Sequence, residues 1–266
     1  PVIGEFPEPN IVIDHLDLRK YLSPKEWTLP ESLPLDENFG KIVGLYLANG
    51  SIIADSLIAI SHNIELDNVD FIKNWCDKYN IKNGTMITQA KHTHFINSDL
   101  LAKLFKLWIE NENKEMPSDA FTSNLEFVRG ILNGYFSTTN SIIDEHNGSL
   151  AINSDSEDMI TGLGVLCSRF GIMGEQSNQP VIENNKPGEI IHTYTIRNSF
   201  AVKWVEEIGS CHPEKNSLMK NIIMSVALMN VLQINFIMYL SLLHVLRDNF
   251  IMSFALLIQN NLFIYP

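Results

Sequence analysis

The chain has 266 residues, of which 45% are hydrophobic, and its formal net charge is −12. This length allows one large domain or two small ones, and the hydrophobic fraction predicts a sizeable core. The acidic balance argues against a strong general affinity for nucleic acid, which depends on clustered Lys and Arg, although it leaves room for a local basic patch.

The three cysteines, Cys76, Cys167 and Cys211, are odd in number and widely spaced. They form neither a CxxC pair for zinc nor a disulfide framework, so we expect an intracellular, reducing setting in a compartment that the sequence does not indicate. Because the sequence begins at Pro1 and not at Met, we expect a processed product or a piece of a longer polypeptide.

Residues 1–35 hold six of the eleven prolines. Proline removes backbone donors and favours extended segments, so this region is predicted to be a connecting arm with little regular structure. Within the arm, residues 11–13 could pair as a short strand.

Residues 36–120 are predicted to form a first half. Asp36 is a suitable N-cap for an apolar helix, and Gly50 is suited to end it in a left-handed conformation. The patterns that follow predict, in order, two strands within 51–64, a helix at 66–79, a strand pair at 86–95 and a helix at 99–109.

Residues 121–217 are predicted to repeat this order. Ser123 and Glu126 form a capping-box pair before the next apolar helix, and Asn140 stands where Gly50 stood. The later patterns predict strands at 141–144 and 149–153, a helix at 157–170, extended runs at 180–183 and 190–197, and a helix at 200–208.

The two matching orders predict an α+β fold made of two αββαββα halves related by a pseudo-twofold axis. Small residues stand four apart in the first helix of each half, at Gly44 and Ala48 and again at Gly134 and Thr138. Residues four apart lie on one helix face, so these positions are expected to let the two helix backbones approach closely.

Residues 218–266 form an apolar extension with uncharged runs at 221–246 and 250–265. Both runs approach the length of a transmembrane helix. Four amide side chains in the first run are awkward in hydrocarbon, namely Asn221, Asn230, Gln233 and Asn235. A membrane-associated tail, a buried or unfolded extension, and a sequence altered relative to its ancestor all stay open.

Two stretches, Gly44–Ser51 and Arg129–Asn140, resemble the paired motifs of the LAGLIDADG (DOD-type) homing endonucleases, in the form that is embedded in inteins. The first family motif commonly reads Gly-Leu-Tyr-Leu-Ala-acid-Gly-Ser, and this chain departs from it at Asn49. The second commonly reads Arg-Gly-x-Leu-x-Gly-Tyr-Phe-Ser-x-Asp-Gly, and this chain departs from it at Thr139 and Asn140. The resemblance covers roughly residues 36–210.

The resemblance implies a monomer whose two saddle-shaped sheets grip the major groove of double-stranded DNA. It also implies one acid at the C-terminal end of each motif helix, where the acids recruit Mg²⁺ for phosphodiester cleavage. Here Asn49 and Thr139 replace both acids, so we expect weakened Mg²⁺ binding and impaired cleavage. Asp55 and Asp144 are the candidate substitute ligands, and the alternative is that they are solvated strand or turn residues.

Lys91 and Arg197 lie on predicted strands that, by the resemblance, would face DNA. Each could contact a phosphate or a base edge, or could be a solvated charge. A non-cleaving DNA- or RNA-binding module on the same fold is the alternative function. An intein also needs a Cys or Ser first residue and a His-Asn end, so the sequence as printed, from Pro1 to Pro266, is not expected to splice.

Other residue groups have simpler interpretations. His92 and His94 share one face of a strand, but no third ligand is evident, so ordinary strand histidines are favoured over a metal site. The three residues Trp75, Trp108 and Trp204 fall on apolar helix faces and are expected in the core. Cys211 and His212 lack a partner acid for thiol chemistry.

Overall fold

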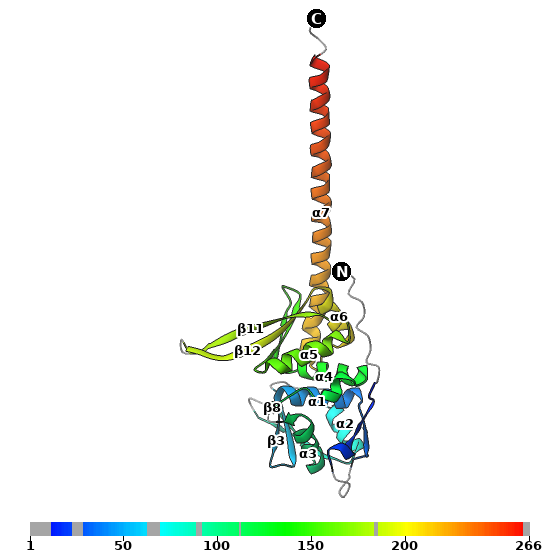
Figure 1. Ribbon diagram of the computed structural model, residues 1–266, viewed down its shortest axis with the longest axis vertical. Helices are drawn as coiled ribbons and strands as arrows, with labels where there is room; N and C mark the ends of the chain where they lie inside the picture. Colours follow the sequence, from blue (N-terminus) through cyan, green and yellow to red (C-terminus); the bar gives the residue numbers. More distant parts are fainter. Residues whose placement is uncertain are drawn as a thin grey trace. The chain divides into compact units, whose positions relative to one another are not determined.

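A computed structural model describes residues 12–22, 29–62, 70–88, 92–111, 113–183 and 186–262 of the chain. The chain divides into two units, residues 1–223 and residues 224–266. The first unit contains the order helix, two strands, helix, two strands, helix twice in succession (Figure 1). The predicted α+β fold with two αββαββα halves is confirmed.

The elements of the first half lie close to their predicted positions. The predicted strand pair at 86–95 is in fact longer at both ends, and part of the predicted helix at 66–79 lies outside the described residues. The elements are α1 (Glu37–Asn49), β3 (Gly50–Ile53), β4 (Leu57–His62), α2 (Asp70–Lys78), β5 (Lys82–Ile87), β6 (His92–Asn97) and α3 (Asp99–Trp108).

The second half repeats this series. The two extended runs predicted at 180–183 and 190–197 are parts of a longer β11–β12 hairpin, visible in Figure 1. The elements are α4 (Leu125–Phe136), β9 (Ser141–Asp144), β10 (Ser149–Ser154), α5 (Glu157–Ser168), β11 (Gly174–Glu183), β12 (Lys186–Arg197) and α6 (Ser199–Glu207).

Each half builds one antiparallel four-stranded sheet. The strand order is β3-β4-β6-β5 in the first and β9-β10-β12-β11 in the second, which is the same order in repeat terms. The first strand follows directly from the central helix in the first sheet and after a short turn in the second, and in both sheets it pairs with the second strand along a hairpin. This shared topology supports the internal duplication predicted from the element order.

The arm is more structured than predicted. Its described part contains strand β1 (His15–Asp17), the 3₁₀ turn η1 (Leu18–Lys20) and strand β2 (Ser32–Pro34), and β1 pairs antiparallel with β2. The prediction of little regular structure is wrong here because Leu16 and Leu33 are buried, and burying them stabilises the pair. The strand expected at 11–13 is reduced to one bridge between Ile13 and Ser123, and Ile11 lies outside the described residues.

The caps at the start of the two central helices are of the same type. The Asp36 carboxylate accepts a hydrogen bond from the Phe39 backbone N–H at 2.8 Å, as predicted. At α4 the predicted Ser123 cap is wrong by one residue, because the Asn124 side chain accepts from the Phe127 N–H at 2.9 Å. The Ser123 hydroxyl instead donates to the Ala120 carbonyl.

The predicted left-handed helix ends are also wrong. Gly50 has φ −88° and ψ 162°, an extended conformation, because α1 passes directly into β3. Glycine is required there for space, since a Cβ would lie 2.2 Å from the Tyr46 ring. Helix α4 ends earlier, with Ser137 as its C-cap, so Asn140 lies in the turn beyond it and outside the left-handed region.

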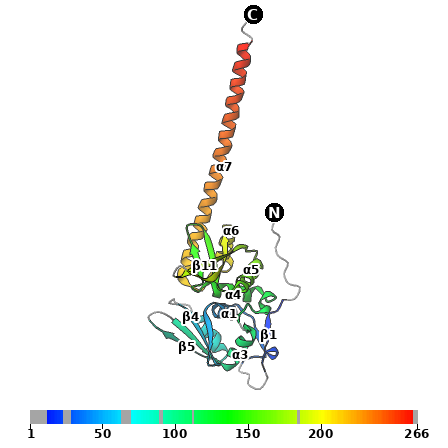
Figure 2. The ribbon, with the colours of Figure 1, turned by 60° about the vertical axis from the view of Figure 1, so that its left-hand side comes forward.

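The two central helices pack backbone against backbone, and Figures 1 and 2 show α1 and α4 side by side. A Cβ on Gly44 would lie 2.1 Å from the Ile131 carbonyl oxygen, and one on Gly134 would lie 2.3 Å from the Lys41 carbonyl oxygen. Gly40 and Gly130 make the same kind of approach one turn earlier. The close contact is therefore made by glycines at these four positions.

Aromatic side chains fill the core around this helix pair. The Phe39 ring stacks on Trp75 at 5.1 Å between centroids and on Trp108 at 6.1 Å. Trp204 is fully buried and packs against Phe136. The expectation that the three tryptophans belong to the core is confirmed.

The connection between the halves and the C-terminal region complete the chain. The connection contains β7 (Glu110–Asn111), β8 (Asn113–Lys114) and the 3₁₀ turn η2 (Ser118–Phe121), and α7 runs from Pro213 to Leu262. One stretch among the described residues, Pro213–Arg247, is long and apolar enough to cross a membrane by length and composition. Many large apolar side chains between Met224 and Leu246 are exposed. Membrane association through 218–266 stays a prediction.

Replacing either Gly44 or Gly134 by Val is expected to destabilise the fold by about 3 kcal/mol or more, because the added atoms force the helix backbones apart. Denaturant unfolding followed by circular dichroism measures the change. Gly84→Ala is the matched control, since nothing lies within 4 Å of its added Cβ. Wild-type stability in both valine variants would contradict the close approach.

The exposed apolar side chains of residues 224–246 are expected to make the full chain depend on detergent for solubility. A chain that ends after Asn230 should remain in the supernatant without detergent, with an unchanged near-ultraviolet spectrum from the buried tryptophans. Equal solubility of both chains in detergent-free buffer would contradict this expectation.

Candidate nucleic-acid interface

The two motif helices bring their C-terminal ends together. Asn49 is the last residue of α1 and is half-buried, and Thr139 lies beyond α4 and is exposed. The Asn140 side-chain amide donates to the Ala48 carbonyl at 3.4 Å, which links the end of one motif to the end of the other. The residues next to Asn49 and Thr139 in the chain therefore meet at the ends of the two motifs.

Each helix end is bonded to a lysine that sequence reasoning missed. The Lys114 Nζ donates to the Tyr46 carbonyl at 3.2 Å and to the Gly50 carbonyl, and it lies 5.1 Å from the centre of the Tyr46 ring. Lys114 comes from β8, shortly after the third helix of the first half.

Lys215 makes the equivalent contacts in the second half. Its Nζ donates to the carbonyls of Phe136 at 2.9 Å, of Thr138, and of Ser141 at 3.2 Å, and to the Ser141 hydroxyl. It lies 5.2 Å from the centre of the Phe136 ring. Phe136 is the repeat counterpart of Tyr46, so the two lysines share one equivalent acceptor carbonyl and one equivalent ring.

Both ammonium groups lie where helix electrostatics favours a cation. The last carbonyls of a helix carry the negative end of its dipole and lack intrahelical partners. Burial lowers the pKa of Lys215 to about 8, which still leaves the ammonium as the main form at pH 7. The sequence signal that could have found them is a lysine shortly after the third helix of each half.

The candidate substitute ligands lie away from the helix ends. Asp55 is in the β3–β4 turn, where Lys106 Nζ approaches its carboxylate at 3.1 Å. Asp144 is at the end of β9, where its carboxylate accepts from the Asn147 and His146 backbone N–H groups at 3.0 and 3.1 Å, and these hydrogen bonds lower its pKa. The Asp144 carboxylate therefore holds its hairpin turn, whereas the Asp55 carboxylate forms an ion pair with a lysine of α3.

The residues at the helix ends do not fit Mg²⁺, whose preferred protein ligands include carboxylate oxygens. Asn49 and Thr139 supply neutral side chains, and Lys114 and Lys215 occupy carbonyl oxygens beside them. Among the described residues, no three His, Cys, Asp or Glu side chains are grouped so that they could hold a metal ion. His92 and His94 therefore gain no third ligand within the described part.

A cleft of about 780 Å³ opens beside the end of α1. Its lining includes Ala48, Lys114, Glu115, Asp155, Asp158 and His192. Glu115, Asp155 and Asp158 are exposed acids, so the cleft carries more negative than positive charge around the lysine. Such a lining disfavours a phosphate at this end of the helix pair.

The exposed face of the second sheet offers neutral hydrogen-bonding groups. Leu150 and Ile152 of β10 point into the core, so Ala151 and Asn153 belong to the other face. There Thr193 donates to Asn153 at 2.9 Å, and Arg197 is bonded to Glu175. Lys91 lies outside the described residues.

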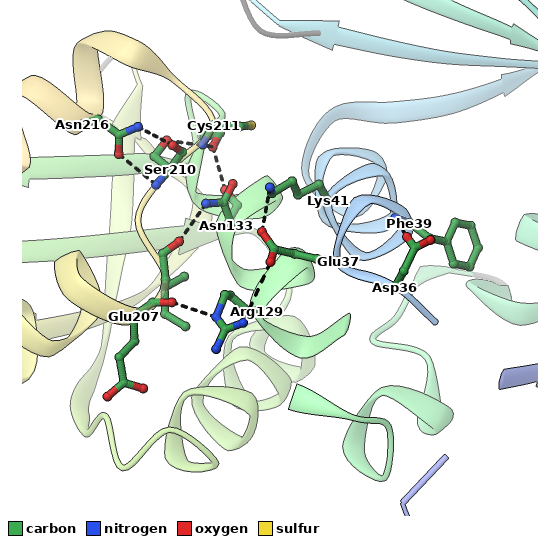
Figure 3. Close-up of polar contacts among 12 residues, drawn as sticks. Asp36, Glu37, Phe39, Lys41, Arg129, Asn133, Glu207, Ser210, Cys211 and Asn216 are labelled. Carbon is green, nitrogen blue, oxygen red and sulfur yellow. Dashed lines mark hydrogen bonds and ion pairs between the residues drawn. The ribbon is translucent and has the colours of Figure 1, made fainter. Parts of the chain in front are cut away.

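Polar residues of the second motif make structural contacts, which are drawn in Figure 3. Arg129 Nε donates to the Glu207 carbonyl at 2.9 Å, and its guanidinium lies 3.9 Å from the Glu37 carboxylate. Lys41 lies 2.7 Å from the same carboxylate, and Asn133 donates to the Ile208 carbonyl at 2.8 Å. Arg129 thus ties α4 to α1 and to the end of α6.

The cysteines are unsuited to nucleophilic chemistry. Burial raises the pKa of the Cys76 thiol to about 12 and also raises the pKa values of Cys167 and Cys211. A thiol with a raised pKa holds little thiolate at neutral pH, and the thiolate is the nucleophile.

Comparison with solved structures shows which known fold this chain shares. The homing endonuclease I-DmoI in complex with DNA and Ca is 12% identical, with a TM-score of 0.51 over 69% of this chain and 97% of that chain. Full-length DUF199/WhiA from Thermatoga maritima is 11% identical, with a TM-score of 0.48 over 83% of this chain and 72% of that chain. I-DmoI is also described in complex with DNA and Mn.

Comparison by sequence gives distant relatives, and no family model matches the chain. The DNA-directed RNA polymerase subunit Rpo1C of Methanocaldococcus jannaschii is 25% identical over 234 residues, which cover 84% of this chain and 25% of that protein. The uncharacterized protein MJ1054 of the same organism is 25% identical over 200 residues, which cover 69% of this chain and 22% of that protein. The chain thus spans about a quarter of the length of these two relatives and has the fold of the LAGLIDADG homing endonucleases.

Proposed function

We propose that this chain is a monomeric LAGLIDADG-type domain that binds double-stranded DNA and whose cleavage is impaired. The two-half fold and the exposed sheet face support DNA binding, and a protein of the same fold is described in complex with DNA. The neutral groups on the described sheet face suit contacts to base edges, which carry sequence information.

The observation that carries impaired cleavage is the chemistry at the two helix ends. Metal-assisted phosphodiester hydrolysis depends on anionic ligands that hold the metal beside the scissile bond. Asn49 and Thr139 provide no negative charge. The described carboxylates nearest in sequence are engaged elsewhere, Asp55 with Lys106 and Asp144 with the turn after β9. We therefore expect weak divalent metal binding and slow or absent strand cutting.

We further propose that the domain is of the intein-embedded kind and works inside the cell. Most of the chain matches two longer proteins, of which it spans about a quarter each. A module that recurs within larger proteins fits this pattern. The resemblance of Gly44–Ser51 and Arg129–Asn140 to the motifs of the intein-embedded form supports the same proposal.

Binding without cutting is expected on a DNA duplex that carries the matching empty insertion site of the host gene. A gel shift in 50 mM salt should show a specific complex that a scrambled duplex does not displace. Because few described cations face the sheet surface, affinity should fall only weakly with added salt. Preferential binding of RNA of the same sequence would replace DNA with RNA as the partner, and no binding to either would refute the proposal.

Cleavage is expected to be absent with Mg²⁺ or Mn²⁺ and to be restored in part by the double change Asn49→Asp and Thr139→Asp. The regained carboxylates supply the missing metal ligands, so double-strand cutting should rise by about a hundredfold or more. The double variant Asn74→Asp and Thr88→Asp adds the same charge at exposed positions and should not cut. Efficient cutting by the wild-type chain would refute the impairment.

A further inference from the structure

We propose that His212 forms a pH-sensitive N-cap, which in its neutral form holds the start of α7 against the end of α4 and which protonation releases. Residues 209–216 contain the connection from α6 and the first turn of α7. This joining segment is bonded to α4 at neutral pH and leaves it in acid. The inference concerns the joining segment alone and holds whether or not the chain binds DNA.

The first turn of α7 shows what the imidazole does. The helix begins at Pro213, and the His212 carbonyl accepts from the Asn216 N–H at 3.0 Å, so His212 is the N-cap. The His212 Nδ1 accepts from the Glu214 N–H at 3.2 Å, which satisfies one of the N–H groups that lack an intrahelical partner. A charged imidazole carries a proton on both ring nitrogens. Protonation therefore replaces this acceptor by a donor that faces another donor.

Further hydrogen bonds join the capped turn to α4. The Ser137 hydroxyl, at the end of α4, lies 2.7 Å from the Ser210 hydroxyl and accepts from the Cys211 N–H at 2.8 Å. The Ser210 hydroxyl in turn accepts from the His212 N–H at 3.0 Å. Asn216 is bonded to the Ser210 backbone through both its side-chain oxygen and its side-chain nitrogen, as Figure 3 shows. Loss of the cap therefore weakens the attachment of this segment to α4.

The surroundings of the ring disfavour a positive charge. His212 is only 5% exposed, and its burial and the Lys215 ammonium lower its pKa, against an opposite effect of the Glu214 carboxylate. Lys41 of α1 adds positive charge on the side of Cys211, whose thiol stays neutral because burial raises its pKa. The end of α4 contributes a neutral hydroxyl to the hydrogen bonds of this segment. The neutral imidazole is thus the form that suits the folded chain.

The direction of the pH effect follows from these contacts. The folded chain binds a proton on His212 less readily than the unfolded chain, in which the ordinary pKa is about 6.5. The stabilising effect of the cap is therefore complete above about pH 6.5 and is lost as the pH falls through the lower pKa of the folded state. The glycine contacts of α4 with α1 involve no titratable side chain, so the helix pair should outlast the joining segment in acid.

Hydrogen exchange of the full chain in detergent, measured by mass spectrometry at about pH 7.5 and pH 5.5 and corrected for intrinsic exchange rates, tests the inference. Protection of residues 209–216 should fall by about tenfold at the lower pH, as expected for the loss of one N-cap, while the centre of α4 stays protected. In His212→Asn the cap acceptor does not titrate, so the fall should be less than about twofold. The matched control His146→Asn changes an exposed histidine and should behave like the wild type.

Unchanged protection of residues 209–216 in the wild type would overturn the inference, as would an equal fall in His212→Asn. Simultaneous loss of protection in α4 would also overturn it, because that would indicate unfolding of the whole first unit. If His212→Asn does not fold, His212→Asp replaces it, since Asp is a good N-cap and stays ionised over this range, and a fall like that of the wild type counts against the inference. Failure to bind DNA in the assays above would leave these results unchanged, so the two proposals fail separately.

Discussion

The fold depends on one contact, the backbone approach of α1 and α4 through Gly40, Gly44, Gly130 and Gly134. Every one of these positions faces a carbonyl oxygen of the other helix at a distance that excludes a Cβ. This approach sets the two sheets on either side of a pseudo-twofold axis and brings the two helix ends together, where Asn140 reaches Ala48. The packing of α1 against α4 therefore fixes where the two helix ends lie.

The packing of α1 against α4 does not depend on the charged groups at the C-terminal ends of these helices. The packing of the helix pair rests on glycines and on an aromatic core around Phe39, none of which carries charge. The negative helix ends still need positive charge nearby, and Lys114 and Lys215 supply it from the segments that follow α3 and α6. Neutral residues at Asn49 and Thr139 are thus compatible with an intact fold, because the glycine contacts of the helix pair do not involve them.

Local sequence patterns predicted most of the elements but not the contacts between distant segments. Helix α1 was predictable because its cap, Asp36, and its apolar positions lie within one short window. The cap of α4 was misplaced because Ser123 and Asn124 are both good caps and only the bond to Ala120 decides between them. The pairing of β1 with β2 was missed because proline density outweighed a few buried leucines in the sequence pattern.

The candidate site was likewise predictable only in part. The meeting of the Asn49 and Thr139 ends was predictable from the paired motifs. The lysines were not, because their acceptors are backbone carbonyls more than sixty positions away in sequence, as for Lys114 and Tyr46 with a separation of 68. The ion pair of Asp55 with Lys106 and the turn contacts of Asp144 depend on three-dimensional geometry that composition does not reveal. The close approach at Gly44 and Gly134 was predictable from the small residues, whereas the same approach at Gly40 and Gly130 was not predicted.

The most direct test of this account is a crystal structure of the full chain grown in Mn²⁺, with the metal located by anomalous scattering. The account predicts no manganese peak between Asn49 and Thr139. It also predicts that the Nζ atoms of Lys114 and Lys215 lie within hydrogen-bond distance of the carbonyl oxygens of Tyr46 and Phe136. A manganese ion at the helix ends, with either lysine displaced from these carbonyls, would contradict it.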